Sequence, residues 1–240
     1  VAGGEYLNEE RPFNFGAAYA LVEVRPVDWF RANAGARVDV YSTFGPIVVP
    51  RGALIFRPVD GGVLKVMGGR AFRAPSVYEQ YYNDGGFSQV AAVDPDRGHE
   101  LKPEAIVSGE IEYLQRFLED WVAIGSLASS YVDDIITTVI DESGPDVIRY
   151  ANSETPLVTL GGEVELRREW RRGWMVAAFY GYQRAQFIDA TDRALADNPR
   201  VINAPEHQAG ARGVVPILDD LAAVGLRGTL EAPRRIGYAG

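Results

Sequence analysis

Carboxylates at alternating positions come closest to a catalytic arrangement in this sequence. Glu110 and Glu112 would project from the same face of a strand, where two carboxylates can act as the acid and base of glycoside hydrolysis. Nothing beyond that spacing supports hydrolysis. The Gly-x-Ser-x-Gly motif of serine hydrolases and the Gly-x-x-x-x-Gly-Lys phosphate loop are both absent from the sequence. We therefore predict that the chain is not an enzyme.

Metal-binding side chains are present, but their spacing matches no familiar metal site. Acidic clusters that could hold calcium occur at Asp94 with Asp96, Asp133 with Asp134, Asp141 with Glu142, and Asp189 with Asp192. They lack the glycine-containing spacing of an EF-hand loop, so solvated loops are the favoured interpretation. The histidines, His99 and His207, have no His partner nearby, and the chain has no cysteine. We predict no metal site and no cofactor.

A long polar segment, residues 73–103, combines aromatic and cationic side chains. Such side chains on a long loop above a rigid scaffold are typical of binding surfaces. The alternative is a loop folded on its own aromatic side chains. We hypothesise that this segment contributes to ligand binding. The candidate contact residues are Arg73, Tyr78, Tyr81, Tyr82, Phe87 and Arg97, and His99 lies in the same segment.

The elements that would carry these residues follow a period of two. Between residues 30 and 41, one parity is apolar and the other holds Arg31, Arg37 and Asp39, as expected for a strand with one apolar and one polar face. The same alternation predicts about ten strands, many longer than is usual in soluble proteins. Their ranges are 15–24, 30–41, 53–57, 63–72, 104–117, 121–132, 160–170, 174–186, 208–215 and 221–230.

The connections between these strands are of two kinds that alternate along the chain. Short polar turns are expected at 26–28, 60–62, 119–120, 171–173 and 218–220, and long connections at 42–50, 73–103, 133–156 and 187–206. In an antiparallel meander, alternate turns lie at the same end of the sheet. This arrangement, with short turns at one rim and long loops at the other, is typical of outer-membrane barrels. A β-sandwich with Greek-key crossings would not sort its loops in this way.

All tryptophans lie beside predicted short turns: Trp29, Trp121, Trp170 and Trp174. Indole rings favour the membrane–water interface, where an apolar body and a polar N–H are both accommodated. We interpret the four as an aromatic girdle at the short-turn rim, in preference to aromatic corners of a soluble β domain.

The polar parity of the strands is expected to face a wet interior. We predict that a charged set lines the lumen: Arg31, Arg37, Asp39, Glu110, Glu112, Glu163, Glu165 and Arg167. These side chains could contact a plug or a passing ligand, or could simply pair across strands as in the solvated interior of any large barrel.

Composition excludes several other classes. The 240 residues carry a net charge of −9, which argues against nucleic-acid binding because phosphates require a basic face. No apolar run approaches the roughly 18–20 residues of a transmembrane helix, and the first residues do not form a signal peptide.

Several motifs occur in an order that resembles the barrel domain of TonB-dependent outer-membrane receptors. The most specific is Gly-Arg-Ala-Phe-Arg-Ala-Pro-Ser at 69–76, followed by Leu-Lys-Pro-Glu at 101–104 and Glu-Ile-Glu-Tyr at 110–113. Upstream, Asn-Ala-Gly-Ala-Arg-Val-Asp at 33–39 is similar to another strand of that family. Further matches are Gly-Gly-Glu-Val-Glu-Leu at 161–166, Tyr-Gly-Tyr at 180–182 and Asn-Ala-Pro-Glu-His at 203–207. The resemblance covers most of the chain.

The resemblance implies an all-β, antiparallel up-and-down transmembrane barrel, present as a partial barrel. Such receptors have about 22 strands, so residues 1–240 would be one fragment of a single barrel domain from its C-terminal half, without the plug domain or the final strands. The implied function is TonB-dependent uptake of a scarce ligand such as an iron–siderophore complex or cobalamin. The implied partners are outer-membrane lipid, the plug of the same chain, TonB and a small-molecule ligand that can be a metal chelate. Long loops would be extracellular and short turns periplasmic.

Two alternatives to this reading stay open at this stage. A passive porin would share the barrel but would need neither a plug nor TonB. A soluble β-sandwich that binds a carbohydrate or a protein would share the strand content but would be soluble without detergent.

Overall fold

The structure, a computed structural model, describes residues 10, 12–170, 173–190, 193–217 and 221–236 as a strand-rich chain. Ten strands form one antiparallel sheet: β1 (Phe15–Val27), β2 (Phe30–Tyr41), β3 (Gly45–Phe56), β4 (Gly62–Arg73), β5 (Glu104–Phe117), β6 (Trp121–Asp133), β9 (Leu157–Glu169), β10 (Met175–Phe187), β11 (His207–Pro216) and β12 (Ala223–Glu231). The remaining elements lie in long connections: α1 (Val77–Tyr81), the 3₁₀ helix η1 (Pro95–Arg97), the hairpin β7 (Ile136–Ile140) and β8 (Ile148–Asn152), and α2 (Arg193–Asp197).

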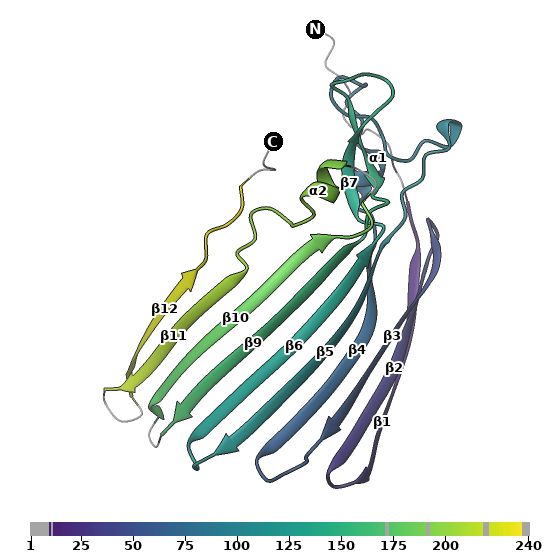
Figure 1. Cartoon of the computed structure of the whole chain (residues 1–240). Helices are drawn as coiled ribbons and strands as arrows, with labels where there is room; N and C mark the ends of the chain where they lie inside the picture. Colours follow the sequence, from purple (N-terminus) through teal and green to yellow (C-terminus); the bar gives the residue numbers. More distant parts are fainter. Residues whose placement is uncertain (1–9, 11, 171–172, 191–192, 218–220, 237–240) are drawn as a thin grey trace.

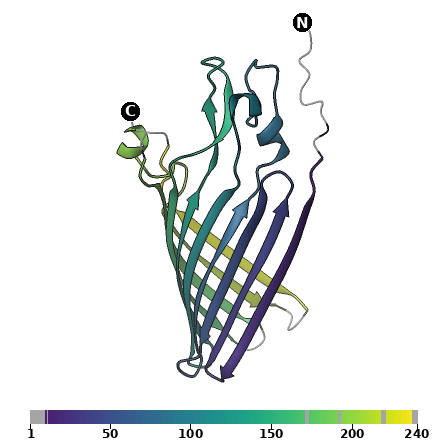
Figure 2. The same cartoon turned by 90° about the vertical axis from the view of Figure 1, so that its right-hand side faces the viewer.

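The strands follow one another as a meander. Each is paired with its neighbour in sequence, except that β6 pairs with β9 because β7 and β8 form a separate two-stranded sheet. Figure 1 shows the strands side by side and inclined, and Figure 2 shows that the sheet is bent into a trough. The predicted partial up-and-down barrel is therefore confirmed. The sandwich alternative is wrong, because these strands belong to one curved sheet and do not divide into two packed layers.

The two rims of the sheet differ as the alternation of connections predicts. The hairpin turns between β1 and β2 and between β5 and β6 lie at one end, with the end of β9 and the start of β10, and α1, β7 and α2 lie at the other (Figure 1). Residues 171–172 and 218–220, which belong to two of the expected short turns, lie outside the described residues.

One predicted connection is wrong. Residues 42–50 were expected to be a long loop, but β2 and β3 are joined by a turn at 42–44, and β3 starts at Gly45 rather than near residue 53. Pro46 and Pro50 make this stretch look unlike a strand. They are tolerated because β3 pairs with β2 along its whole length but with β4 only from Arg51 onward, so the first half of β3 has one free side where a missing N–H breaks no ladder.

The strand register gives the sheet one charged and one apolar face. Residues opposite each other across a ladder share a face, so Glu112 lies with Lys65 on β4 and Ser126 on β6. The next residues along the strands form the apolar face, where large side chains stay exposed: Leu127 is 64% exposed and Val164 57% exposed. Among the described strand residues of the sheet, Val122 and Ala177 are the buried apolar side chains, so the sheet has little apolar core of its own.

The hydrophobic core of buried residues lies among the long loops instead. It consists of Ala92, Leu101 and Ile136, with Val93 and Tyr150 packed against it. These residues come from two different connections, one between β4 and β5 and the other between β6 and β9. The two connections therefore fold together above the sheet.

Candidate ligand-binding site at the loop end of the sheet

The connection between β4 and β5 begins with a short capped helix. Ser76 caps α1: its hydroxyl accepts a hydrogen bond from the Glu79 N–H at 3.2 Å, and the Glu79 carboxylate accepts one from the Ser76 N–H at 2.7 Å. This is a capping box, which satisfies two of the amide groups left unpaired at a helix start. The Ser-x-x-Glu spacing at 76–79 is visible in the sequence, but we did not predict a helix cap from it.

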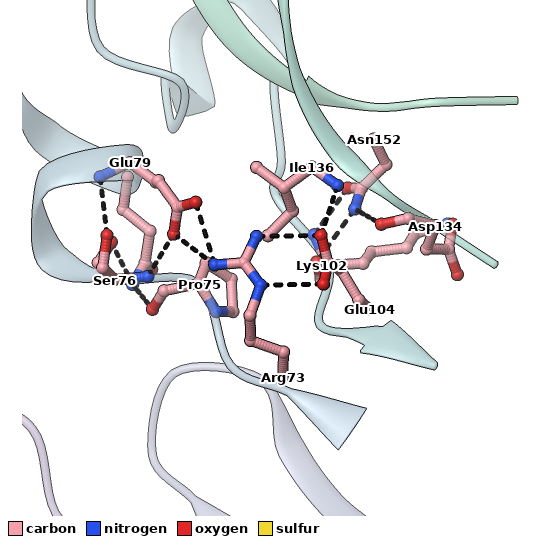
Figure 3. A network of polar contacts seen from close by, with 10 residues as sticks. Arg73, Pro75, Ser76, Glu79, Lys102, Glu104, Asp134, Ile136 and Asn152 are labelled. Atoms are coloured by element: carbon pink, nitrogen blue, oxygen red, sulfur yellow. Dashed lines mark hydrogen bonds and ion pairs between the residues drawn. The ribbon is translucent and has the colours of Figure 1, made fainter. Parts of the chain in front are cut away.

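Arg73, the last residue of β4, joins this helix to the neighbouring strand. Its Nη1 donates to both carboxylate oxygens of Glu79, at 2.9 and 3.0 Å. Its Nε and Nη2 form a two-pronged pair with Glu104, the first residue of β5, at 2.7 and 2.8 Å (Figure 3). Partial burial works to raise the pKa of Glu79, but hydrogen bonds from Ser76 and Arg73 outweigh it and hold that pKa below its usual value.

The same network continues into the hairpin of the next long connection. Glu104 Oε1 also accepts the N–H of Ile136, the first residue of β7, at 2.8 Å. Asn152, the last residue of β8, exchanges hydrogen bonds with the backbone of Lys102 at 2.8 and 2.9 Å and donates to the Asp134 carbonyl at 2.7 Å. Figure 3 shows the contacts that run from α1 through Arg73 and Glu104 to Ile136, with the separate contacts of Asn152 beside them.

The two connections are also joined by an isolated parallel β-bridge between Gln89 and Ile148. The Ile148 N–H on β8 donates to the Ser88 carbonyl at 2.9 Å, and the Val90 N–H donates back to the Ile148 carbonyl at 3.0 Å. Asp84 shapes the turn before this segment by accepting from the Ser88 hydroxyl and from the N–H groups of Phe87, Ser88 and Gln89. These bonds lower the pKa of Asp84 to about 2. We call residues 74–103 and 134–156 together the outer unit.

The predicted ligand-contact residues are spread over the outer unit. Tyr78 and Tyr82 stack with ring centres 4.5 Å apart, and Tyr150 of β8 meets Tyr78 edge-on at 6.2 Å. Phe87 points into solvent and is 89% exposed. Arg97 lies in η1, whose flanking residues Asp94 and His99 pair through their backbones. Tyr150 was missed, because its strand lies within a segment read as a loop.

Tyr81 lines a cavity of about 640 Å³ beside α1. The cavity lies between α1, the turn joining β2 to β3, and the residues that lead into β1, and five of its thirteen lining residues are aromatic. The lining includes Phe13, Phe15, Tyr41, Phe44 and Tyr81. None of these except Tyr81 was a sequence-based candidate, because the other four lie outside the 73–103 segment.

The predicted lumen-facing charges lie on the charged face and are largely paired. The ion pairs, mostly across or along neighbouring strands, are Lys65–Glu112 at 2.6 Å, Arg37–Asp39 at 2.6 Å, Arg167–Glu169 at 2.9 Å, Arg212–Glu165 at 3.2 Å and Arg31–Glu23 at 3.5 Å. Asp39 is 1% exposed despite its charge. Glu110 and Glu163 make no ion pair with another described residue, and they share this face by register. Lys65 and Arg212 were missed in the sequence, where nothing reveals their partners.

All four tryptophans lie beside the short connections, at the rim opposite the outer unit. The Arg168 guanidinium lies over the rings of Trp170, at 4.3 Å from the centroid, and Trp121, at 5.5 Å. Trp29 and Trp174 are exposed. Their assignment as a membrane girdle stays a prediction.

Comparison with known proteins identifies the architecture. A sequence model of the family described as "TonB dependent receptor-like, beta-barrel" matches residues 2–227. The chain belongs to this family. Receptors of the family are transporters and not enzymes, which agrees with the prediction from the sequence, and their barrels are outer-membrane proteins.

Solved structures of TonB-dependent receptors have the same fold. The siderophore receptors PirA from Pseudomonas aeruginosa and from Acinetobacter baumannii superpose with TM-scores of 0.68 and 0.69 at 16% and 17% identity, covering 92% and 94% of this chain but 38% and 35% of theirs. The ferric-catecholate import receptor Fiu from E. coli K12 gives a TM-score of 0.66 at 14% identity, over 95% of this chain and 36% of its own. The chain thus spans little more than a third of these receptors. No functionally curated protein matches the sequence.

Two features are absent from the described residues. Within the described ranges, no group of three or more His, Asp or Glu side chains is placed to hold a metal ion. Of the predicted acidic clusters, Asp192 lies outside those ranges. The helices that the structure describes are all too short or too polar to cross a membrane.

Proposed function

We propose that this chain is part of the barrel wall of a TonB-dependent outer-membrane receptor that imports a scarce nutrient, such as an iron–siderophore complex or cobalamin. The observation that carries the proposal is the ten-stranded meander with its long connections gathered at one rim in a folded outer unit. A scaffold of this kind presents a binding surface on one side of a membrane while its strands cross it. The net charge of −9 gives no support to nucleic acid as a partner.

In this proposal the two faces and the two rims have distinct partners. The apolar face contacts outer-membrane lipid, and the charged face lines the lumen and meets the plug domain of the full-length chain. The outer unit is extracellular and the short turns are periplasmic, where the four tryptophans form an interfacial girdle. TonB acts on the plug, so its contact lies outside this part of the receptor.

Ligand capture is assigned to the aromatic side chains of the outer unit. Replacing Tyr78, Tyr81 and Tyr82 together by Ala in the full-length receptor should weaken uptake without lowering surface abundance. Phe117, an aromatic residue of β5 near the opposite rim, provides a control substitution to Ala. Unchanged uptake by the triple variant would remove the outer-unit tyrosines from the ligand site.

Energy dependence separates the proposal from a passive porin. The full-length receptor, expressed in a host lacking its own iron receptors, should accumulate ⁵⁵Fe from at least one of a hydroxamate, a catecholate or a carboxylate chelate. Deletion of TonB should abolish that accumulation. Accumulation at an equal rate without TonB would show a passive pore, and no accumulation from any of the three chelates would overturn iron-chelate import.

A further inference from the structure

Among the described residues, few side-chain hydrogen bonds join the outer unit to the ten-stranded sheet: Arg73 donates to Glu79, Glu104 accepts from Ile136, and Asp133 accepts from Asp134. We propose that Arg73 is a positioning residue that holds the whole outer unit in a fixed relation to β4 and β5. The unit includes the β7–β8 hairpin, to which Arg73 makes no hydrogen bond or ion pair. The value of this positioning for ligand capture rests on the proposed function, but the positioning itself does not.

The geometry around Arg73 engages every side of its guanidinium. Nη1 donates hydrogen bonds to Glu79 on α1, and Nε and Nη2 donate to Glu104 on β5, at distances between 2.7 and 3.0 Å. A planar guanidinium presents a rigid fork of donors that fits carboxylates in this two-pronged way, and a lysine cannot reproduce it. Arg73 therefore sets the distance between α1 and the start of β5.

Glu104 extends the hold to a second connection. The side chain of Glu104 is only 12% exposed, and the oxygen that accepts Arg73 Nη2 also accepts the Ile136 N–H. A carboxylate so poorly solvated is costly once its cation is removed. Loss of Arg73 should make Glu104 turn toward water and break its hydrogen bond with Ile136, which frees the start of β7 although no hydrogen bond joins Arg73 to β7.

The far end of the hairpin has an attachment of its own. Asn152 binds the backbone of Lys102 and Asp134 and does not use Arg73. Loss of Asn152 should therefore loosen the hairpin and leave α1 in place. This asymmetry distinguishes a relay through Glu104 from a purely local role, in which Arg73 would stabilise α1 and nothing beyond it.

Hydrogen–deuterium exchange of the purified, detergent-solubilised full-length receptor tests the relay without any ligand. Arg73→Ala should speed exchange roughly tenfold or more in two peptides, 76–82 and 136–152, as expected when charge-assisted hydrogen bonds are lost. Asn152→Ala should speed exchange only in 136–152, and Glu79→Gln only in 76–82. Arg70→Ala is the matched control: Arg70 lies three residues earlier on β4, is exposed, and makes no ion pair with another described residue.

Protection of 136–152 that is unchanged in Arg73→Ala would overturn the proposal, and so would equal effects of Arg70→Ala and Arg73→Ala. Arg73→Lys is a second variant that distinguishes the proposal from general misfolding. It keeps the positive charge, so it should speed exchange in the same two peptides but to a smaller degree than Arg73→Ala. Where an imported ⁵⁵Fe chelate is found, Arg73→Ala should raise the half-saturation concentration of uptake severalfold and leave the maximal rate per surface receptor unchanged. Absence of uptake would count against the proposed function alone, because the exchange pattern would still stand or fall separately.

Discussion

At the scale of single residues, close packing between strands leaves room for glycine and nothing larger at particular positions. A Cβ on Gly210 of β11 would lie 2.6 Å from the Phe179 ring and 2.8 Å from the backbone carbonyl oxygen of Gly228. The ring can turn away, but the carbonyl belongs to the ladder and cannot. Gly228 on the adjacent β12 has nothing within 4 Å of the same added atom.

These two glycines make a matched pair of substitutions. Gly210→Ala in the full-length receptor should lower the free energy of unfolding by about 1–3 kcal/mol, the usual cost of overpacking. Gly228→Ala should change it by less than about 0.5 kcal/mol. Urea unfolding followed by tryptophan fluorescence measures both, and equal effects would show that β11 and β12 do not approach as described.

Asp84 gives the outer unit a defined sensitivity to acid. Its folded-state pKa of about 2 lies below the ordinary Asp value, so the stabilisation it provides is complete above about pH 4 and is lost as the pH falls through about 2. Amide exchange at Ser88 and Gln89, corrected for intrinsic rates, should therefore stay slow at pH 4 and accelerate near pH 2. Asp84→Asn should remove this pH dependence. A midpoint near pH 4 in the unaltered receptor would contradict the role of Asp84.

At the scale of elements, the two halves of β3 differ in their pairing. Residues 45–50 pair only with β2, whereas residues 51–56 pair with both β2 and β4. Pro46, Val48 and Pro50 have the same parity, so their backbone nitrogens face the same side of the strand. Two of the three are proline, which identifies that side as the unpaired one. Leu54 has this parity too, but it lies where β3 pairs with β4, opposite Val66.

A proline scan of β3 checks this reading. Val48→Pro should leave the folded barrel intact, because no ladder hydrogen bond is removed on the free side. Leu54→Pro should cost about 1–3 kcal/mol, because it removes a ladder hydrogen bond and leaves a backbone carbonyl of β4 without its partner. The heat-modifiable gel shift of the full-length receptor reports the folded fraction. A severe loss in Val48→Pro would place a paired strand beside the first half of β3.

Most strands could be predicted from the sequence, but the first half of β3 could not. Alternation alone predicted strands such as 104–117, because each has one apolar and one charged face. In β3 the prolines conceal the pattern, since their tolerance depends on which neighbour is missing. The β7–β8 hairpin and the roles of Arg73, Glu104 and Tyr150 depend on contacts between segments far apart in the sequence, which no local pattern reveals.

At the scale of the whole molecule, the two faces of the sheet call for different surroundings, one apolar and one aqueous. Apolar side chains as large as Leu127 and Leu226 remain exposed on one face, and ion pairs such as Lys65–Glu112 occupy the other. Both outer strands, β1 and β12, have one paired neighbour each. An exposed strand edge and a broad apolar face both favour association, which fits a wall that continues on either side within a bilayer.

The most direct test of the barrel-wall proposal is whether alternate residues along β5 are accessible to lipid and to water in turn. The chain contains no cysteine, so single cysteines bearing a spin label can be placed at 107, 108, 110, 111 and 112 of the full-length receptor in lipid vesicles. Labels replacing Val107 and Ile111 should be relaxed by oxygen, which dissolves in lipid, and labels replacing Ser108, Glu110 and Glu112 by a water-soluble nickel chelate. An absent alternation, or one with the opposite phase, would contradict a barrel wall with its apolar face in the membrane.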